Sequence, residues 1–127
     1  MAQIQSVMLV DDDKFLLDMY AVKFKGAGIT VDAVADPEEA LKKLRAGATP
    51  DAILTDIVMP VLDGFGFLEA IQKEKLAPHA AIIMLSNQGQ ESDIARAKEL
   101  GAKGYIVKAS SIPSEVLEQT LAIVGKA

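Results

Sequence analysis

The sequence contains no cysteine, one histidine and few basic residues. Without cysteine the protein can form neither a disulfide framework nor a thiolate metal site. The histidine, His79, lies between Pro78 and a predicted strand, and we interpret it as a surface loop residue. Eighteen acidic residues against thirteen basic residues give a formal net charge of −5, which disfavours nonspecific binding to phosphate backbones. We therefore expect no direct nucleic-acid partner.

Long apolar runs are also absent. No apolar segment approaches the roughly 20 residues that a membrane-spanning helix needs. The first ten residues, MAQIQSVMLV, lack the basic region and the long apolar core of a signal peptide. The length of 127 residues is typical of one domain, and no low-complexity linker divides it. We expect a soluble, cytoplasmic protein with no membrane partner, forming a single domain over residues 1–127.

The sequence does contain a regular alternation of short β-rich runs and segments with helical periodicity. The predicted strands, each followed by a predicted helix, are residues 6–10, 29–35, 52–55, 81–85 and 105–107. This alternation is typical of an α/β domain with a parallel sheet. Asp32 interrupts the second run, as is common in an edge strand. We predict a flavodoxin-like, doubly wound, five-stranded parallel sheet of order 2-1-3-4-5, with helices on both faces.

Helical periodicity predicts which side chains face the core. In the first helix, which ends near Gly26 and Gly28, the predicted core residues are Phe15, Leu16, Met19 and Val22. In the last helix, which begins at Pro113, they are Val116, Leu117, Leu121 and Val124. The helix from Glu91 to Leu100 has only a thin apolar stripe, so we expect it to be the least firmly held.

Polar side chains stand where four of the predicted strands end. They are Asp11, Asp12 and Asp13 after the first strand, Asp56 after the third, Ser86 after the fourth and Lys108 after the fifth. The carboxyl ends of parallel strands lie at one edge of the sheet, where ligands bind. Each residue alone also has an ordinary interpretation, because aspartate caps helices, serine favours turns and lysine is usually solvated. Their convergence is what indicates a site.

Several carboxylates at one edge predict a bound cation, because like charges destabilise the ionised cluster. Oxygen ligands without histidine or cysteine indicate Mg²⁺, for which Mn²⁺ can substitute. A phosphoryl oxygen suits the remaining metal positions, with Lys108 as a positive charge and Ser86 as a hydroxyl donor. Asp56 is then placed as the nucleophile that forms an acyl phosphate. The additional Asp13 is explained by the positive end of the first helix.

Four stretches match, in order, the motifs of a known family. They are VDDD at 10–13, TDIVMPVLDGFGFL at 55–68, MLSN at 84–87 and KGYIVKA at 103–109. On these stretches the sequence resembles the receiver domain of bacterial two-component response regulators, over essentially its whole length. The resemblance implies that Asp56 is the phosphoacceptor and Lys108 the phosphate-binding lysine. It also implies that Asp11, Asp12 and the backbone carbonyl of Val58 bind Mg²⁺, and that Ser86 and Tyr105 are the switch residues.

The resemblance further implies a signalling phosphoprotein rather than an enzyme with a substrate of its own. Family members take the phosphoryl group from a phosphohistidine on a sensor histidine kinase or a histidine phosphotransfer protein. They catalyse only their own phosphorylation and dephosphorylation. The expected output is docking to a downstream target protein through the fourth helix, fifth strand and fifth helix, as a monomer or as a weak dimer on activation.

The sequence departs from the family at the residue after Lys108, where Ala109 replaces the usual proline. A cis peptide before a residue other than proline costs about 3–4 kcal/mol, so we predict a trans Lys108–Ala109 bond. Val58 cannot orient an attacking water with its apolar side chain, and Asn87 and Gln88 are alternative candidates for that role.

Two other functions compete with a receiver. The stretch Val10 to Asp13 also fits the nucleophile motif of haloacid-dehalogenase-like phosphatases, in which Asp11 would be phosphorylated. No acidic motif outside the last helix follows Lys108 to complete that metal site, and the chain is too short for a cap domain. The second alternative is a pseudo-receiver that binds partners without phosphorylation, which the retained acids, serine and lysine disfavour.

Overall fold

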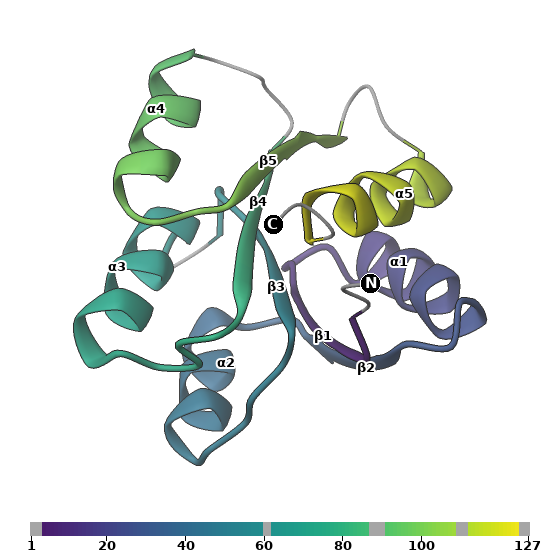
Figure 1. Ribbon diagram of the computed structural model, residues 1–127, viewed down its shortest axis with the longest axis horizontal. Helices are drawn as coiled ribbons and strands as arrows, with labels where there is room; N and C mark the ends of the chain where they lie inside the picture. The colour runs from purple at the N-terminus through teal and green to yellow at the C-terminus, as the bar shows by residue number, and fades with distance from the viewer. Residues whose placement is uncertain (1–3, 60–61, 87–90, 109–111, 125–127) are drawn as a thin grey trace.

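The computed structural model describes residues 4–59, 62–86, 91–108 and 112–124. The elements in chain order are β1 (Ser6–Val10), α1 (Lys14–Gly26), β2 (Thr30–Val34), α2 (Pro37–Arg45), β3 (Ala52–Asp56), α3 (Gly64–Glu74), β4 (Ala81–Ser86), α4 (Glu91–Glu99), β5 (Gly104–Val107) and α5 (Pro113–Val124). The strands form a parallel sheet of order β2-β1-β3-β4-β5, which confirms the predicted topology. Helices α1 and α5 cover one face of the sheet, and α2, α3 and α4 cover the other (Figure 1).

Strands β3 and β4 lie side by side in the interior of the sheet. Every residue of β3 and of β4 is buried, as expected for apolar runs that are covered by helices on both faces. Strand β2 lies at the edge, where Asp32 forms an ion pair with Lys43 of α2 at 2.7 Å. The predicted edge position of this interrupted strand is therefore confirmed.

Three aspartates begin the helices that follow β1, β2 and β3. The side chain of Asp13 accepts hydrogen bonds from the backbone N–H groups of Phe15 and Leu16 at the start of α1. Asp36 and Asp63 cap α2 and α3 in the same way. These caps satisfy backbone donors that the first turn of a helix leaves free, and they fix the loops at the carboxyl edge of the sheet.

The predicted core face of α1 was wrong at Phe15, Met19 and Val22, which are exposed, whereas Leu16 is partly buried against the core. Phe15 is 73 % exposed and Val22 is 67 % exposed, whereas the buried residues are Leu17, Tyr20, Ala21 and Phe24. Both stripes are apolar, so periodicity alone did not distinguish them. The capped first turn at Asp13 sets the phase of the helix, and the sheet receives the face that carries two aromatic side chains, Tyr20 and Phe24.

The predicted core face of α5 was wrong at one position. Leu121 is exposed, and Thr120 is buried in its place, while Val116 is buried as predicted. A buried hydroxyl is costly unless it is hydrogen-bonded. The Thr120 hydroxyl donates to the Val116 carbonyl at 2.7 Å, which removes that cost. None of the helices in the described ranges is long and apolar enough to cross a membrane.

The turn after α3 contains a strained alanine. Ala77 has a φ of 40°, a left-handed conformation that glycine adopts with less strain. We expect Ala77→Gly to raise the free energy of unfolding by about 0.5–1 kcal/mol, measured by urea denaturation. Ala46→Gly, at a helix cap with a φ of −79°, is the control and should lower it. Equal losses in the two variants would contradict the assignment of strain to Ala77.

Candidate functional site

The structure brings four of the predicted site residues together at the carboxyl edge of the sheet. Asp11 and Asp12 follow β1, and Asp56 ends the neighbouring strand β3. One carboxylate oxygen from each of these three residues lies within 4.8 Å of the other two. The Nζ atom of Lys108, which follows β5, lies 2.8 Å from Asp11 Oδ2 and 3.3 Å from Asp56 Oδ2. Lys108 therefore bridges two carboxylates from different strands.

This cluster is mostly buried, which determines its electrostatics. Asp11, Asp56 and Lys108 are at most 9 % exposed, whereas Asp12 is exposed. Burial raises the pKa of Asp56, and the charge of Asp11 raises this pKa further. Lys108 and a hydrogen bond from the Ile57 N–H oppose that rise only in part. Burial lowers the pKa of Lys108, but the hydrogen bond to Asp11 and the charges of Asp11 and Asp56 raise this pKa by more.

The charges of the cluster do not balance, because three carboxylates face one ammonium group. The raised pKa of Asp56 means that its ionised form costs more here than in water, and added positive charge would offset that cost. An all-oxygen donor set with one exposed carboxylate fits a hard divalent cation that keeps several waters. The residues present therefore fit a magnesium site.

Asp13 does not join this cluster. Its side chain caps α1, and its backbone N–H donates to Asp11 Oδ1 at 2.9 Å. The position of Asp13 at the start of α1 agrees with the prediction that it interacts with the positive end of this helix. Asp13 also holds Asp11 in place, since the same Asp11 side chain accepts from Asp13 and from Lys108.

The other predicted residues lie at the same edge or close to it. Ser86 is buried at the end of β4, one residue beyond the position that pairs with Asp56. Tyr105 in β5 is half-buried against the core on the α2–α4 face of the sheet. The Val58 side chain is exposed. Asn87, Gln88 and the Lys108–Ala109 peptide lie outside the described residues, so the expectations for them remain predictions.

Gly64, which is not among the predicted site residues, supports the loop after Asp56. Its backbone N–H donates to the Ile57 carbonyl at 2.7 Å. A Cβ atom on Gly64 would lie 2.8 Å from Ile57 Cα and closer still to the Asp56 carbonyl oxygen. A glycine immediately after the capping residue Asp63 was the available signal, because glycine is a poor helix former.

Tyr20 is a second residue that the sequence analysis did not identify. It lies on the buried face of α1 and is 2 % exposed. Burial raises the pKa of its phenol, and the charges of Lys108, Asp11 and Asp56 also act on it. Tyr20 therefore lies within reach of the charges of the cluster, but periodicity gave no sign of it because the other face of α1 was predicted as the core face.

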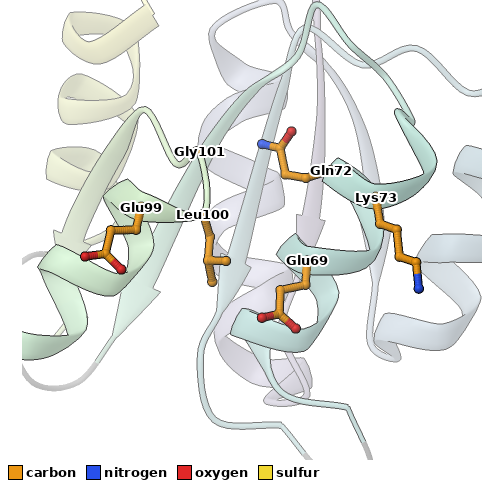
Figure 2. A pocket seen from close by; sticks show the side chains of 6 residues that line it. All are labelled: Glu69, Gln72, Lys73, Glu99, Leu100 and Gly101. Atoms are coloured by element: carbon orange, nitrogen blue, oxygen red, sulfur yellow. The ribbon is translucent and has the colours of Figure 1, made fainter.

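A cavity of about 530 Å³ lies between α3 and α4, lined by Glu69, Gln72, Lys73, Glu99, Leu100 and Gly101 (Figure 2). The two glutamates lie on either side of Leu100, and Lys73 points away from them. None of these residues belongs to the carboxylate cluster. The cavity is consequently a separate feature of the surface.

Comparisons with known proteins agree with this geometry. The family model described as response regulator receiver domain matches residues 7–121. The chain is 34% identical to the probable transcriptional regulator ycf27 of Guillardia theta, covering 96% of this chain and 46% of that protein. It is 32% identical to the alkaline phosphatase synthesis transcriptional regulatory protein PhoP of Bacillus subtilis, covering 96% and 49%. The chain thus spans about half the length of these curated relatives.

Solved structures show the same fold. The chemotaxis response regulator CheY4 of Vibrio cholerae superposes with a TM-score of 0.85 at 30% identity. The match covers 95% of this chain and 99% of that one. The similarity therefore extends over the whole arrangement of sheet and helices that holds the carboxylate cluster.

Proposed function

The chain belongs to the family of response regulator receiver domains, and from this premise we propose that it accepts a phosphoryl group on Asp56 and thereby switches a protein-docking surface. The observation that carries the proposal is the grouping of Asp11, Asp12 and Asp56 oxygens within 4.8 Å, with Lys108 bridging two of them. The phosphatase alternative is not favoured, because the receiver family model matches residues 7–121.

The proposed reaction is an in-line displacement at phosphorus. A carboxylate oxygen of Asp56 forms the new P–O bond, and the P–N bond of the donor phosphohistidine breaks, with the electron pair leaving on the histidine nitrogen. Lys108 binds a phosphoryl oxygen and offsets its charge. Ser86 donates its hydroxyl to another phosphoryl oxygen once the group is on Asp56. Such reactions depend mainly on positioning and charge neutralisation.

The carboxylates of Asp11, Asp12 and Asp56 and the carbonyl of Val58 would hold Mg²⁺, and we propose that Mn²⁺ can replace it. The metal supplies positive charge to the phosphoryl oxygens when it is bound. Lys108 lies beside Asp11 and Asp56, so its charge and that of a bound metal would act together on the phosphoryl group.

Asp12 offers the most selective test of the metal site, because it is exposed and the other two carboxylates are buried. We expect Asp12→Asn to lower Mg²⁺ affinity roughly tenfold, which corresponds to the loss of one anionic ligand. Its free energy of unfolding should change by less than about 0.5 kcal/mol, as for other surface substitutions. Amide chemical shifts during a magnesium titration would measure the affinity.

Asp13→Asn is the matched control for this prediction. Asparagine caps a helix as well as aspartate does, and Asp13 lies outside the carboxylate cluster. Its magnesium affinity should therefore equal that of the wild type. An equal loss in both variants would mean that total charge, and not ligation by Asp12, determines the affinity.

Receiver domains partner with histidine kinases, and the exposed face of α1 offers a docking surface for the phosphodonor protein. Phe15, Met19 and Val22 are exposed and spaced by four and three residues, so they form one apolar stripe along α1. The stripe begins two residues after the cap Asp13, next to the carboxylate cluster. We infer that a helix of the kinase or phosphotransfer protein packs on this stripe while its phosphohistidine reaches Asp56.

The double variant Phe15→Ser/Val22→Ser should slow phosphotransfer from a phosphorylated histidine phosphotransfer protein by about tenfold or more, because buried aromatic anchors carry much of an interface's binding energy. Its phosphorylation by phosphoramidate, a small donor that needs no docking, should stay unchanged. Leu121→Ser, at an exposed leucine of α5, is the control. Equal slowing with both donors would instead indicate damage to the site.

Further features of the function remain proposals. We propose that the chain catalyses only its own phosphorylation and dephosphorylation, and that its output is docking to a target protein through α4, β5 and α5. Its net charge of −5 supports binding to protein rather than to nucleic acid. We propose that residues 1–127 form a single domain. We also propose that the protein is a monomer, or a weak dimer on activation. We also propose a cytoplasmic location, which the proposed phosphohistidine donor supports.

Labelling with acetyl phosphate tests the proposed function. Incubation of the wild type with acetyl phosphate and Mg²⁺ should add the mass of one phosphoryl group to the intact protein, and chelation of the metal should prevent the addition. Asp56→Asn should stay unlabelled, whereas Asp11→Asn should be labelled more slowly. A wild-type protein that gains no phosphoryl group under these conditions would support the pseudo-receiver alternative.

A further inference from the structure

Helix α4 is held to the rest of the molecule at two levels, by β4 beyond its carboxyl end and by α3 along its length. The Ala102 N–H donates to the Ala97 carbonyl at 2.9 Å and closes the end of the helix, and the following Lys103 N–H donates to the Ile82 carbonyl of β4 at 2.7 Å. Along the helix itself Ala97 is the buried residue. A single small side chain contributes little apolar burial, so contacts made by the other side chains of α4 have a large relative effect on its position.

Arg96 makes such a contact at the second level. Its guanidinium carbon lies 4.5 Å from the centre of the Phe65 ring. Phe65 is in the first turn of α3 and is 5 % exposed, so the guanidinium of Arg96 lies over a ring that is otherwise buried in the core. A guanidinium at this distance over an aromatic face is an attractive cation–π arrangement.

Phe65 is connected directly to the loop that carries the phosphoacceptor. It packs in the same core cluster as Ile57 and Met59, the residues that follow Asp56. The preceding residue, Gly64, donates its N–H to the Ile57 carbonyl and packs against the Asp56 backbone. The Arg96–Phe65 stack therefore links the middle of α4 to the backbone on which the phosphoryl group would be placed.

We propose that the Arg96–Phe65 stack holds α4 in its unphosphorylated position and thereby opposes phosphorylation of Asp56. Arg96 and Phe65 are positioning residues, because neither touches the reacting atoms. The inference rests on the proposed function of Asp56. A contact that forms in only one of two conformations shifts the equilibrium toward that conformation. It therefore lowers the affinity of any ligand that prefers the other conformation, by up to the factor by which the contact shifts the equilibrium.

The test uses beryllofluoride, a phosphoryl mimic, with Mg²⁺ and the whole 127-residue chain. Arg96→Gln should increase the affinity for beryllofluoride about two- to fivefold, the range expected for an exposed cation–π contact. Phe65→Leu, which keeps an apolar side chain without the ring, should increase it to a similar extent. The double variant should gain no more than either single variant, since both remove the same contact. Calorimetry measures the affinity.

Lys98→Gln is the control, because it removes the same charge from an exposed position of α4 two residues away. It should leave the affinity unchanged or slightly lower. An Arg96→Gln affinity no higher than that of Lys98→Gln would overturn the inference, as would additive gains in the double variant. A wild-type protein that fails to bind beryllofluoride would instead contradict the proposed function, and the inference with it.

Discussion

Lys108→Met is expected to slow phosphorylation of Asp56 by phosphoramidate about 100-fold or more, because the variant removes the cation that would neutralise the transferring phosphoryl group. Methionine keeps most of the aliphatic volume of the side chain without its charge. The variant should also be less stable in the absence of metal by about 3 kcal/mol or more. Lys108 is the shared partner of Asp11 and Asp56, and both carboxylates are buried.

Magnesium provides a second measurement on the same variant. Because a divalent cation neutralises the carboxylates that Lys108 no longer pairs, Mg²⁺ should raise the melting temperature of Lys108→Met more than that of the wild type. Lys98→Met, at an exposed lysine on α4, controls for the loss of one charge. A Lys108→Met protein labelled within threefold of the wild-type rate would contradict the role assigned to this lysine.

Gly64→Ala is expected to lower the free energy of unfolding by about 2–4 kcal/mol and to reduce labelling of Asp56. Helix propensity predicts the opposite sign, since alanine stabilises a helix by about 1 kcal/mol relative to glycine. The added Cβ would meet the backbone of Asp56 and Ile57, which cannot rotate away as a side chain could. Urea denaturation and the labelling rate measure the two effects.

Gly26→Ala is the matched control for Gly64→Ala. Gly26 ends α1, and a Cβ there would meet no atom within 4 Å. Helix propensity should therefore decide its effect, with stability unchanged or higher by up to about 1 kcal/mol. Similar stability changes in the two variants would show that the close contact between Gly64 and the backbone of Asp56 and Ile57 does not affect stability.

The parallel sheet and the grouping of the site residues could be predicted from local patterns, and the strand order from the order that is common in doubly wound folds. The apolar runs of β1, β3 and β4 indicate strands that are covered on both faces. In a parallel sheet the residues that end such strands meet at one edge. Asp11, Asp56 and Lys108 could thus be placed together without knowledge of any side-chain contact.

Two kinds of feature could not be predicted: which of two apolar stripes of a helix faces the core, and which residues far apart in the sequence come into contact. Helix α1 has two apolar stripes, and only packing decides that Phe24 rather than Phe15 is buried. The close contact of Gly64 with the Asp56 backbone joins residues whose separation in space the sequence does not specify. The same holds for Arg96 and Phe65, which lie on different helices.

Mapping of the phosphorylated carboxylate tests the central claim most directly. Borohydride reduces an aspartyl phosphate to homoserine, and trypsin separates the candidates because Asp11 lies in the peptide of residues 1–14 and Asp56 in that of residues 46–73. After labelling with acetyl phosphate and Mg²⁺, fragmentation of these peptides should locate homoserine at position 56. Homoserine at position 11 would contradict the account and would support the phosphatase chemistry that uses Asp11 as nucleophile.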